Sequence, residues 1–340
     1  MYRETVEGVS RRSRLAIASA LVAVLIVLPV IVFLWMTSVP GRSYDQRMPS
    51  PNAESAQLAA RLRGHVEAIA STPHNIAHPA AYAEVQRYIA TKLGAMGYQV
   101  DRQHVMAGAD NLSVDIRSID QSAKLLVIGA HYDSAGNAPG ANDNGSGVAA
   151  LIEIARALKA RRLSHHVRLI WFANEEPPYF KREGMGSLVA AKSIAASGNP
   201  TIGMISLETI GYFDDRPGSQ HYPPPLSLRY PDRGNFIAFV GMVGARPFVR
   251  RSVGEFRRSA RLPSVGGVAP SFVQGIDWSD HWSFQQHGIP ALMITDTAPF
   301  RYPHYHEKSD APDKLDYYRM ALLVEALQEM IVSLASAKLR

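Results

Sequence analysis

Five segments of the sequence place histidine and carboxylate side chains directly after short apolar runs or in a glycine-rich loop. They contain His131 and Asp133, Asp143, Glu175 and Glu176, Glu208, and His304 and His306. Ligands of open α/β sheets bind at the carboxyl ends of the strands, so we expect these side chains to meet at one edge of a sheet. The chain has no cysteine, and a metal site in it must therefore be built from His, Asp and Glu. This collection of side chains predicts a hydrolytic metal site.

The spacing within these segments suits different tasks for neighbouring side chains. His131 and Asp133 are two residues apart and point the same way in an extended chain, so the carboxylate can accept the imidazole N–H while the other nitrogen binds metal. Glu175 and Glu176 are adjacent and point in different directions, so one can bind metal while the other acts as a general base. Asp143 lies in a glycine-rich loop, which suits a carboxylate that bridges two ions.

The scaffold that positions these residues is predicted from apolar runs and helical patterns. Short apolar runs predict buried strands at 124–130, 167–173, 204–207 and 291–295. Helical spacing predicts helices at 56–70, 80–96, 147–160 and 317–337, with Gly97 ending the second and Ser146 capping the third. Strands separated by helices predict an α/β fold with a mostly parallel, doubly wound sheet and helices on both faces. Residues 213–275 break this rhythm, and we interpret them as an insertion, partly a loop over the site and partly a crossover helix near 246–260.

The N-terminal segment predicts a single transmembrane signal anchor. Residues 15–36 carry no charge and are long enough as a helix to cross a membrane, and Arg11, Arg12 and Arg14 precede them. By the positive-inside rule, residues 1–14 stay in the cytoplasm and the domain lies on the extracytoplasmic side, periplasmic or extracellular. A cleaved signal peptide is the alternative, but residues 37–40 make a poor cleavage site. Residues 37–55 then form a linker, and 56–340 form the catalytic domain.

The net charge of +6 does not indicate nucleic-acid binding, because the basic residues are scattered and no nucleic-acid module is present. The arginine-rich stretch at 246–261 is interpreted as a solvated helix face. We therefore expect peptide substrates and, through the N-terminal helix, a membrane as the partners of this chain.

The segments HYDSAGNAPGANDNGSGVA, NEE, SLETIGYF, SDHWSF and YHEKSD occur in this order. In this order they resemble the co-catalytic zinc aminopeptidase family, which includes secreted bacterial aminopeptidases and glutamate carboxypeptidases, with glutaminyl cyclases as relatives. The resemblance extends from about residue 56 to the C-terminus. It implies a zinc exopeptidase-like fold and two Zn²⁺ per chain.

The metal ligands follow from this resemblance position by position. One zinc is expected at His131, Asp143 and Glu208, and the other at Asp143, Glu176 and His306. Glu208 departs from the family pattern, which usually has an Asp there. It keeps the charge but changes the reach.

The resemblance assigns the remaining positions of the site. Glu175 corresponds to the general base, with Asp133 as a second catalytic residue beside His131. Asp280 and Asp310 are expected to contact the metal ligands, although Asp280 could instead cap a helix. His304 is the rival of His306, whose spacing to Asp310 fits the family's final motif better.

The predicted function is that of a membrane-anchored di-zinc exopeptidase. The leading hypothesis is an aminopeptidase that hydrolyses N-terminal residues from peptides through metal-bound hydroxide. A carboxypeptidase and a glutaminyl cyclase-like enzyme are alternatives, but a cyclase is expected to use a single zinc, whereas all five ligand positions are filled here. A non-catalytic, receptor-like module would have lost ligands, and no ligand position is lost.

Overall fold

The structure, a computed structural model, describes residues 11–120 and 122–336. The chain divides into two compact units, Met1–Ser38 and Val39–Arg340. The first unit contains α1 (Arg11–Thr37), which has Pro29 in its interior. Residues 1–10, most of the predicted cytoplasmic segment, lie outside the described residues.

The predicted transmembrane anchor at residues 15–36 is not supported. Within the described part of the chain, no helix combines the length and the apolar character that crossing a membrane requires.

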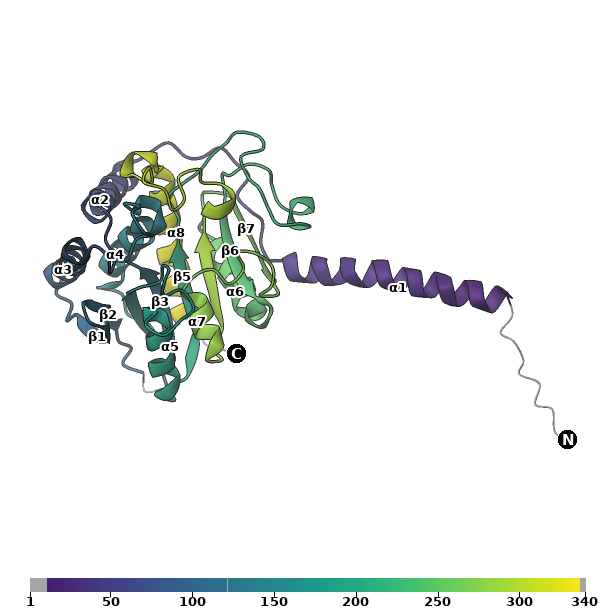
Figure 1. The fold of residues 1–340 in the computed structure, drawn as a ribbon, viewed down its shortest axis with the longest axis horizontal. Coiled ribbons are helices and arrows are strands. Elements are labelled where there is room, and N and C mark those ends of the chain that lie inside the picture. Colours follow the sequence, from purple (N-terminus) through teal and green to yellow (C-terminus); the bar gives the residue numbers. More distant parts are fainter. Residues whose placement is uncertain (1–10, 121, 337–340) are drawn as a thin grey trace. The chain divides into compact units, whose positions relative to one another are not determined.

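The second unit is built on one mixed sheet (Figure 1). Its strands, among the described residues, are β1 (Asp101–Met106), β2 (Ala109–Ile116), β3 (Leu125–His131), β4 (His166–Phe172), β5 (Thr201–Glu208), β6 (Ile237–Met242), β7 (Ser264–Ala269) and β8 (Ala291–Thr295). They lie in the order β1-β2-β4-β3-β5-β8-β6-β7. The central strands β4, β3, β5 and β8 are parallel, whereas β2 and β6 join them antiparallel. The predicted α/β class is confirmed, but the sheet is mixed, because the chain reverses direction at both ends of the parallel core.

Helices cover both faces of the sheet (Figure 1). They are α2 (Ala53–Ile69), α3 (Pro79–Ala95), α4 (Gly147–Leu158), α5 (Gly186–Ala196), α6 (Arg246–Phe256), α7 (His281–Gln286) and α8 (Tyr317–Ser336), with short helical turns η1 (Ala141–Ser146), η2 (Leu226–Leu228), η3 (Val243–Ala245), η4 (Ala298–Phe300) and η5 (Pro312–Lys314). Helix α4 packs on the central strands and α6 on the β6–β8 end, and α2 and α8 pack against them. On the other face, α5 and α7 contact each other and the sheet.

The predicted strands and helices are all present, with boundaries that differ by a few residues. Gly97 ends α3 in a left-handed conformation, as predicted. Ser146 does not cap α4, because its hydroxyl donates to the carbonyl of Asn142 and accepts the backbone N–H of Ile210. The segment predicted to be an insertion contributes the strands β6 and β7 to the sheet, and the helix between them, α6, matches the predicted crossover helix. Residue 337, the last of the predicted final helix, lies outside the described residues.

The apolar core fills both sides of the central strands. On the α5 and α7 side, Phe172 packs against Phe284, with ring centroids 6.0 Å apart. Gly129 of β3 makes room for this packing, since a Cβ at that position would lie 2.1 Å from the Phe172 ring. This close packing fixes β3 in place and with it His131 at the carboxyl end of the strand.

A charged cluster is buried in the helical layer on the opposite side. Glu153 of α4 has a side chain that is 1% exposed and accepts hydrogen bonds from Arg61 at 2.8 Å and His65 at 3.1 Å. Both partners belong to α2. Burial opposes ionisation, but these partners hold the pKa of Glu153 at about 2. The cluster therefore fixes α2 against α4 through an ionised carboxylate.

Residues 39–52 lie along the domain. Arg257, the residue directly after α6, donates to the carbonyls of Pro40 and Gly41, at 3.0 and 2.8 Å. The backbone N–H of Ser264, the first residue of β7, donates to the Ser43 hydroxyl at 2.9 Å. Since β7 is the last strand of the sheet, this segment covers part of an open edge.

Candidate metal centre

The predicted site residues lie at the carboxyl ends of the parallel strands. His131 is the last residue of β3 and Glu208 the last of β5. Glu176 follows the end of β4 and His306 the end of β8, while Asp143 lies in η1, which leads into α4. Parallel neighbours end at the same sheet edge, and the structure therefore brings side chains that are far apart in the sequence into one place.

One cluster contains His131, Asp143 and Glu208, all of them buried. A potential ligand atom from each lies within 4.8 Å of the others. The Nε2 atom of His131 is 3.3 Å from Asp143 Oδ1 and 3.3 Å from Glu208 Oε2. This is the set expected for the first zinc.

A second cluster contains Asp143, Glu176 and His306. The Nε2 atom of His306 is 3.0 Å from Asp143 Oδ2 and 3.3 Å from Glu176 Oε1. Asp143 therefore directs one carboxylate oxygen to each cluster, as a bridging ligand must. In a tetrahedral zinc site with bonds of about 2.0–2.1 Å, neighbouring ligand atoms lie about 3.3–3.4 Å apart. Three of the four contacts have this spacing, and the contact between His306 and Asp143, at 3.0 Å, is shorter.

Three of these atoms are buried and make no hydrogen bond with the described part of the chain: His131 Nε2, Asp143 Oδ1 and Glu176 Oε1. Each nevertheless lies within 3.3 Å of another atom of its cluster. Buried polar atoms without partners are rare and costly. The nitrogen and oxygen atoms thus face a common point between them, which is the arrangement that a cation requires.

Asp133 holds the turn that carries the two glutamates. Its Oδ1 accepts the backbone N–H of Glu175 at 2.9 Å and its Oδ2 accepts that of Glu176 at 3.0 Å. We predicted that this carboxylate accepts the imidazole N–H of His131, but the Nδ1 hydrogen bond goes to the backbone carbonyl of Asp133, at 3.2 Å, and the carboxylate is 3.4 Å away. The two backbone N–H groups occupy the carboxylate instead. In either case Nδ1 carries the proton, and Nε2 is left as the metal-binding atom.

Asp310 does for the Asp143 loop what Asp133 does for the glutamates. Its carboxylate accepts the backbone N–H groups of Asn142 at 2.8 Å and Asp143 at 3.1 Å, and also the hydroxyl of Tyr302 at 2.8 Å. The predicted contact of Asp310 with a metal ligand is therefore present, and it goes through the ligand's backbone.

Comparison with known proteins decides the family. The profile of Peptidase family M28 matches residues 111–331. The chain is also 38% identical over 316 residues to the uncharacterized protein YfbL of Escherichia coli (strain K12), an alignment that covers 88% of this chain and 93% of YfbL. The chain belongs to peptidase family M28. The family predicted from the five motifs is thereby confirmed.

This M28 peptidase is similar in sequence to named peptidases and similar in fold to solved structures. A probable leucine aminopeptidase of Arthroderma otae is 28% identical over 60% of the chain, and the match spans about half of that relative (52%). The LapA aminopeptidase of Legionella pneumophila has the same fold, with a TM-score of 0.66, 19% identity and coverage of 86% of this chain and 78% of LapA. A glutaminyl cyclase of Fimbriiglobus ruber has a TM-score of 0.58 and 18% identity, with coverage of 87% and 99%. The similarity to these two solved structures shows that the M28 peptidase shares their fold.

Glu175 lies beside the ligand candidates of the two clusters, which together are called the M28 centre. It is buried, and a carboxylate oxygen of it is within 4.8 Å of ligand atoms of His131 and Glu176. The contacts of 3.3 Å made by His131 and His306, however, go to the carboxylates of the two clusters and not to Glu175. Burial, together with the charges of Glu176 and Glu208, raises the pKa of Glu175 well above its usual value. A buried carboxyl group with a high proton affinity beside potential metal ligands is suited to proton transfer.

Tyr305 belongs to the M28 centre but was not singled out in the sequence. Its ring stacks on that of His306, with centroids 3.9 Å apart and planes at 23°. Burial and the carboxylates of Asp143, Glu176 and Glu208 raise the pKa of Tyr305, so its hydroxyl keeps its proton. Its position directly before His306 was the available signal.

The structure also shows where His304, the rival of His306, and Asp280, the possible helix cap, lie. The Nδ1 atom of His304 forms a hydrogen bond with the Ser309 hydroxyl, and its ring contacts that of Tyr302. Among the described residues, His304 belongs to neither cluster. Asp280 precedes α7 but its side chain does not cap the helix. It is fully buried, and burial raises its pKa to about 7.

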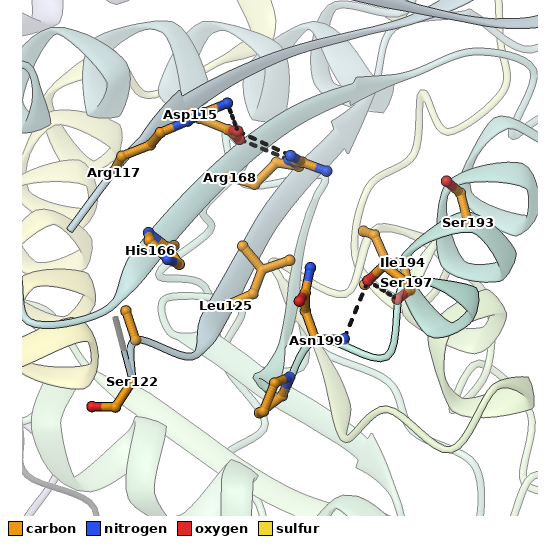
Figure 2. A pocket seen from close by; sticks show the side chains of 12 residues that line it. Asp115, Arg117, Ser122, Leu125, His166, Arg168, Ser193, Ile194, Ser197 and Asn199 are labelled. Atoms are coloured by element: carbon orange, nitrogen blue, oxygen red, sulfur yellow. Dashed lines mark hydrogen bonds and ion pairs between the residues drawn. The ribbon is translucent and has the colours of Figure 1, made fainter. Parts of the chain in front are cut away.

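A separate cavity of about 530 Å³ lies at the amino ends of the parallel strands, away from the M28 centre (Figure 2). Its walls include Leu125 and His166, the first residues of β3 and β4. The guanidinium of Arg168 there is paired with Asp115 by two hydrogen bonds, at 2.7 and 2.9 Å. None of the predicted site residues lines this cavity.

Proposed function

We propose that this M28 peptidase is a di-zinc aminopeptidase that releases N-terminal residues from peptides. The observation that carries the proposal is the shared carboxylate of Asp143, whose two oxygens face His131 and His306 respectively. The relatives named as leucine aminopeptidases support the choice of reaction.

The residues present fit two zinc ions. Imidazole nitrogens and carboxylate oxygens are ligands that zinc accepts, and their spacing matches a tetrahedral site. Asp143, Glu176 and Glu208 supply three negative charges against four positive charges, which leaves the pair able to bind one more anion. When bound, such a pair polarises a substrate carbonyl and lowers the pKa of a water molecule.

The protein's own groups then handle protons and charge. The Glu175 carboxylate accepts a proton from the attacking water and passes it to the leaving amine. The protonated Tyr305 hydroxyl donates a hydrogen bond to the substrate carbonyl oxygen as negative charge develops on it.

Purified protein and a panel of reporter substrates test this function. We expect two zinc ions per chain and turnover of substrates with a free α-amine. N-acetylated substrates and substrates for carboxypeptidases should not be turned over. Glu175→Gln should lower kcat by about 10²–10⁴-fold at unchanged zinc content. Glu183→Gln, an exposed carboxylate of the same loop, is the matched control and should behave as wild type. Full activity of Glu175→Gln would show that another group is the base.

A glutaminyl cyclase-like reaction is the second candidate, favoured by the shared fold with the Fimbriiglobus ruber enzyme. Peptides that begin with glutamine, assayed in water labelled with heavy oxygen, separate the two reactions. Hydrolysis places the label in the released carboxylate, whereas cyclisation releases ammonia and places no label.

The extracytoplasmic location of the domain stays a prediction. Treatment of intact cells with a protease tests it, because only an exported domain is cleaved.

A further inference from the structure

The turn that carries the two glutamates begins at a residue with an unusual backbone conformation. Asn174, directly before Glu175, has a φ of 54°, in the left-handed region that residues other than glycine rarely adopt. Its side chain and backbone are buried, with 1% of the residue exposed. The direction in which the chain continues after Asn174 depends on this angle, and so does the direction in which Glu175 and Glu176 approach the M28 centre.

A tyrosine of α3 holds Asn174 in this conformation. The Tyr82 hydroxyl donates to Asn174 Oδ1 at 3.0 Å and accepts the backbone N–H of the same residue at 3.1 Å. A phenol hydroxyl has one proton and can also accept, so both hydrogen bonds form at once. Tyr82 and Asn174 are each 1% exposed, and bulk water therefore does not compete for these hydrogen bonds. One oxygen atom thus ties the side chain of Asn174 to its own backbone.

The Tyr82 hydroxyl completes a row of side-chain acceptors along the turn. The backbone N–H groups of residues 174, 175 and 176 are accepted by Tyr82 Oη, Asp133 Oδ1 and Asp133 Oδ2, respectively. The ring of Tyr82 also stacks on that of Tyr132, the residue between His131 and Asp133, with centroids 5.0 Å apart and planes at 27°. Tyr82 therefore contacts both the segment that follows β3 and the segment that follows β4.

We propose that Tyr82 is a positioning residue that keeps Asn174 left-handed and thereby directs Glu175 toward the metal ligands. Tyr82 acts through Asn174 and is too deeply buried to contact a substrate. It lies outside residues 111–331, which the M28 profile matches, so α3 adds this support from a part of the chain that the profile does not cover. The inference rests on the proposed function for the role of Glu175 as the base.

Initial rates of the full chain at saturating zinc test the inference. We expect Tyr82→Phe, which keeps the ring and its stacking, to lower kcat by about 10–10²-fold with KM and zinc content unchanged, because a displacement of about 1 Å has an effect of this order. Tyr98→Phe is the matched control. It removes a tyrosine hydroxyl that donates to the carbonyl of Ala155 in α4, at 2.8 Å, and should keep the wild-type kcat.

Substitutions of Asn174 separate backbone positioning from general damage to the fold. Glycine adopts the left-handed conformation without steric cost, whereas alanine does not. Combined with Tyr82→Phe, Asn174→Gly should therefore recover most of the lost kcat and Asn174→Ala none of it. A merely structural loss would not be repaired by a more flexible residue. With Tyr82 in place, Asn174→Ala should lower kcat more than Asn174→Gly, which tests the same claim should Tyr82→Phe not fold.

The outcomes distinguish this inference from the proposed function. A wild-type kcat in Tyr82→Phe, or equal kcat values in the Asn174→Gly and Asn174→Ala variants, would overturn the inference and leave the proposed function standing. Full activity of Glu175→Gln would instead show that the base of the proposed function is wrong, and the inference would fall with it.

Discussion

Asp133→Asn tests whether one carboxylate places both glutamates of the centre. Asp133 is 2% exposed and accepts the backbone N–H groups of Glu175 and Glu176 with separate oxygens. An asparagine can accept one of them through its carbonyl, but its amide group faces the other N–H with no acceptor. One buried N–H is left without a partner, and the remaining hydrogen bond loses its charge.

The expected cost follows from these two hydrogen bonds. A buried unsatisfied donor costs about 1–3 kcal/mol, and a hydrogen bond to a charged group contributes about 1.5–3 kcal/mol, more than a neutral one. We therefore expect Asp133→Asn to lower the free energy of unfolding by about 2–4 kcal/mol. A displacement of the turn by about 1 Å would also reduce kcat by about 10²-fold.

Urea unfolding followed by circular dichroism gives the stability, and initial rates at saturating zinc give kcat. Asp115→Asn is the control, since Asp115 also makes two charge-assisted hydrogen bonds, to Arg168, but at the opposite edge of the sheet. It should cost stability without changing kcat. If Asp133→Asn lost stability but kept kcat within about twofold, the carboxylate would not position the glutamates, and our interpretation of this turn would be wrong.

Three further outcomes are expected. Tyr305→Phe should lower kcat by about 10²-fold or more, with little change in KM or zinc content; an unchanged kcat would remove the hydroxyl from the reaction. Glu153→Gln should destabilise the fold at pH 7: a folded-state pKa of about 2 against the usual 4.5 corresponds to about 3 kcal/mol, which the half-exposed Arg61 reduces to about 2. Because that pKa is depressed, the stabilisation is complete above about pH 5 and is lost as the pH falls through the folded-state pKa, so the stabilities of wild type and variant should converge as the pH approaches 2 in urea titrations. In the metal-free protein, burial raises the pKa of Glu176 to about 8, and neighbouring carboxylates, against the effect of burial, raise that of His306 to about 11. Both groups must then release protons when zinc binds, so calorimetric heats at pH 7 should depend on the ionisation enthalpy of the buffer and affinity should rise with pH; heats independent of the buffer would contradict this.

The parts of the site that sequence reasoning predicted are those at the ends of strongly apolar strands. β3, β5 and β8 are continuous apolar runs, and the residues after such runs must lie at one sheet edge. His131, Glu208 and His306 could therefore be found from local pattern together with motif order.

The missed parts depend on contacts that no local pattern encodes. Ser279 reaches Glu208 across 71 positions of sequence, and the sequence marks Tyr305 only by its place before His306, without showing that the two rings stack. β6 and β7 were missed for another reason. Each strand is short and contains glycine, and the residues on either side are rich in proline and arginine. The segment therefore has the composition of an irregular loop. β6 becomes a strand because it pairs with β8 and continues the sheet, and β7 in turn pairs with β6.

The docked segment 39–52 limits how far the chain can be shortened for experiments. A truncated protein that starts at α2 would bare the amide at the start of β7 and leave the Arg257 guanidinium without the carbonyls of Pro40 and Gly41. An uncovered terminal strand is a template for pairing with strands of other molecules, which promotes aggregation during purification. Preparations for crystallisation or kinetics should therefore retain the chain from Val39 onward.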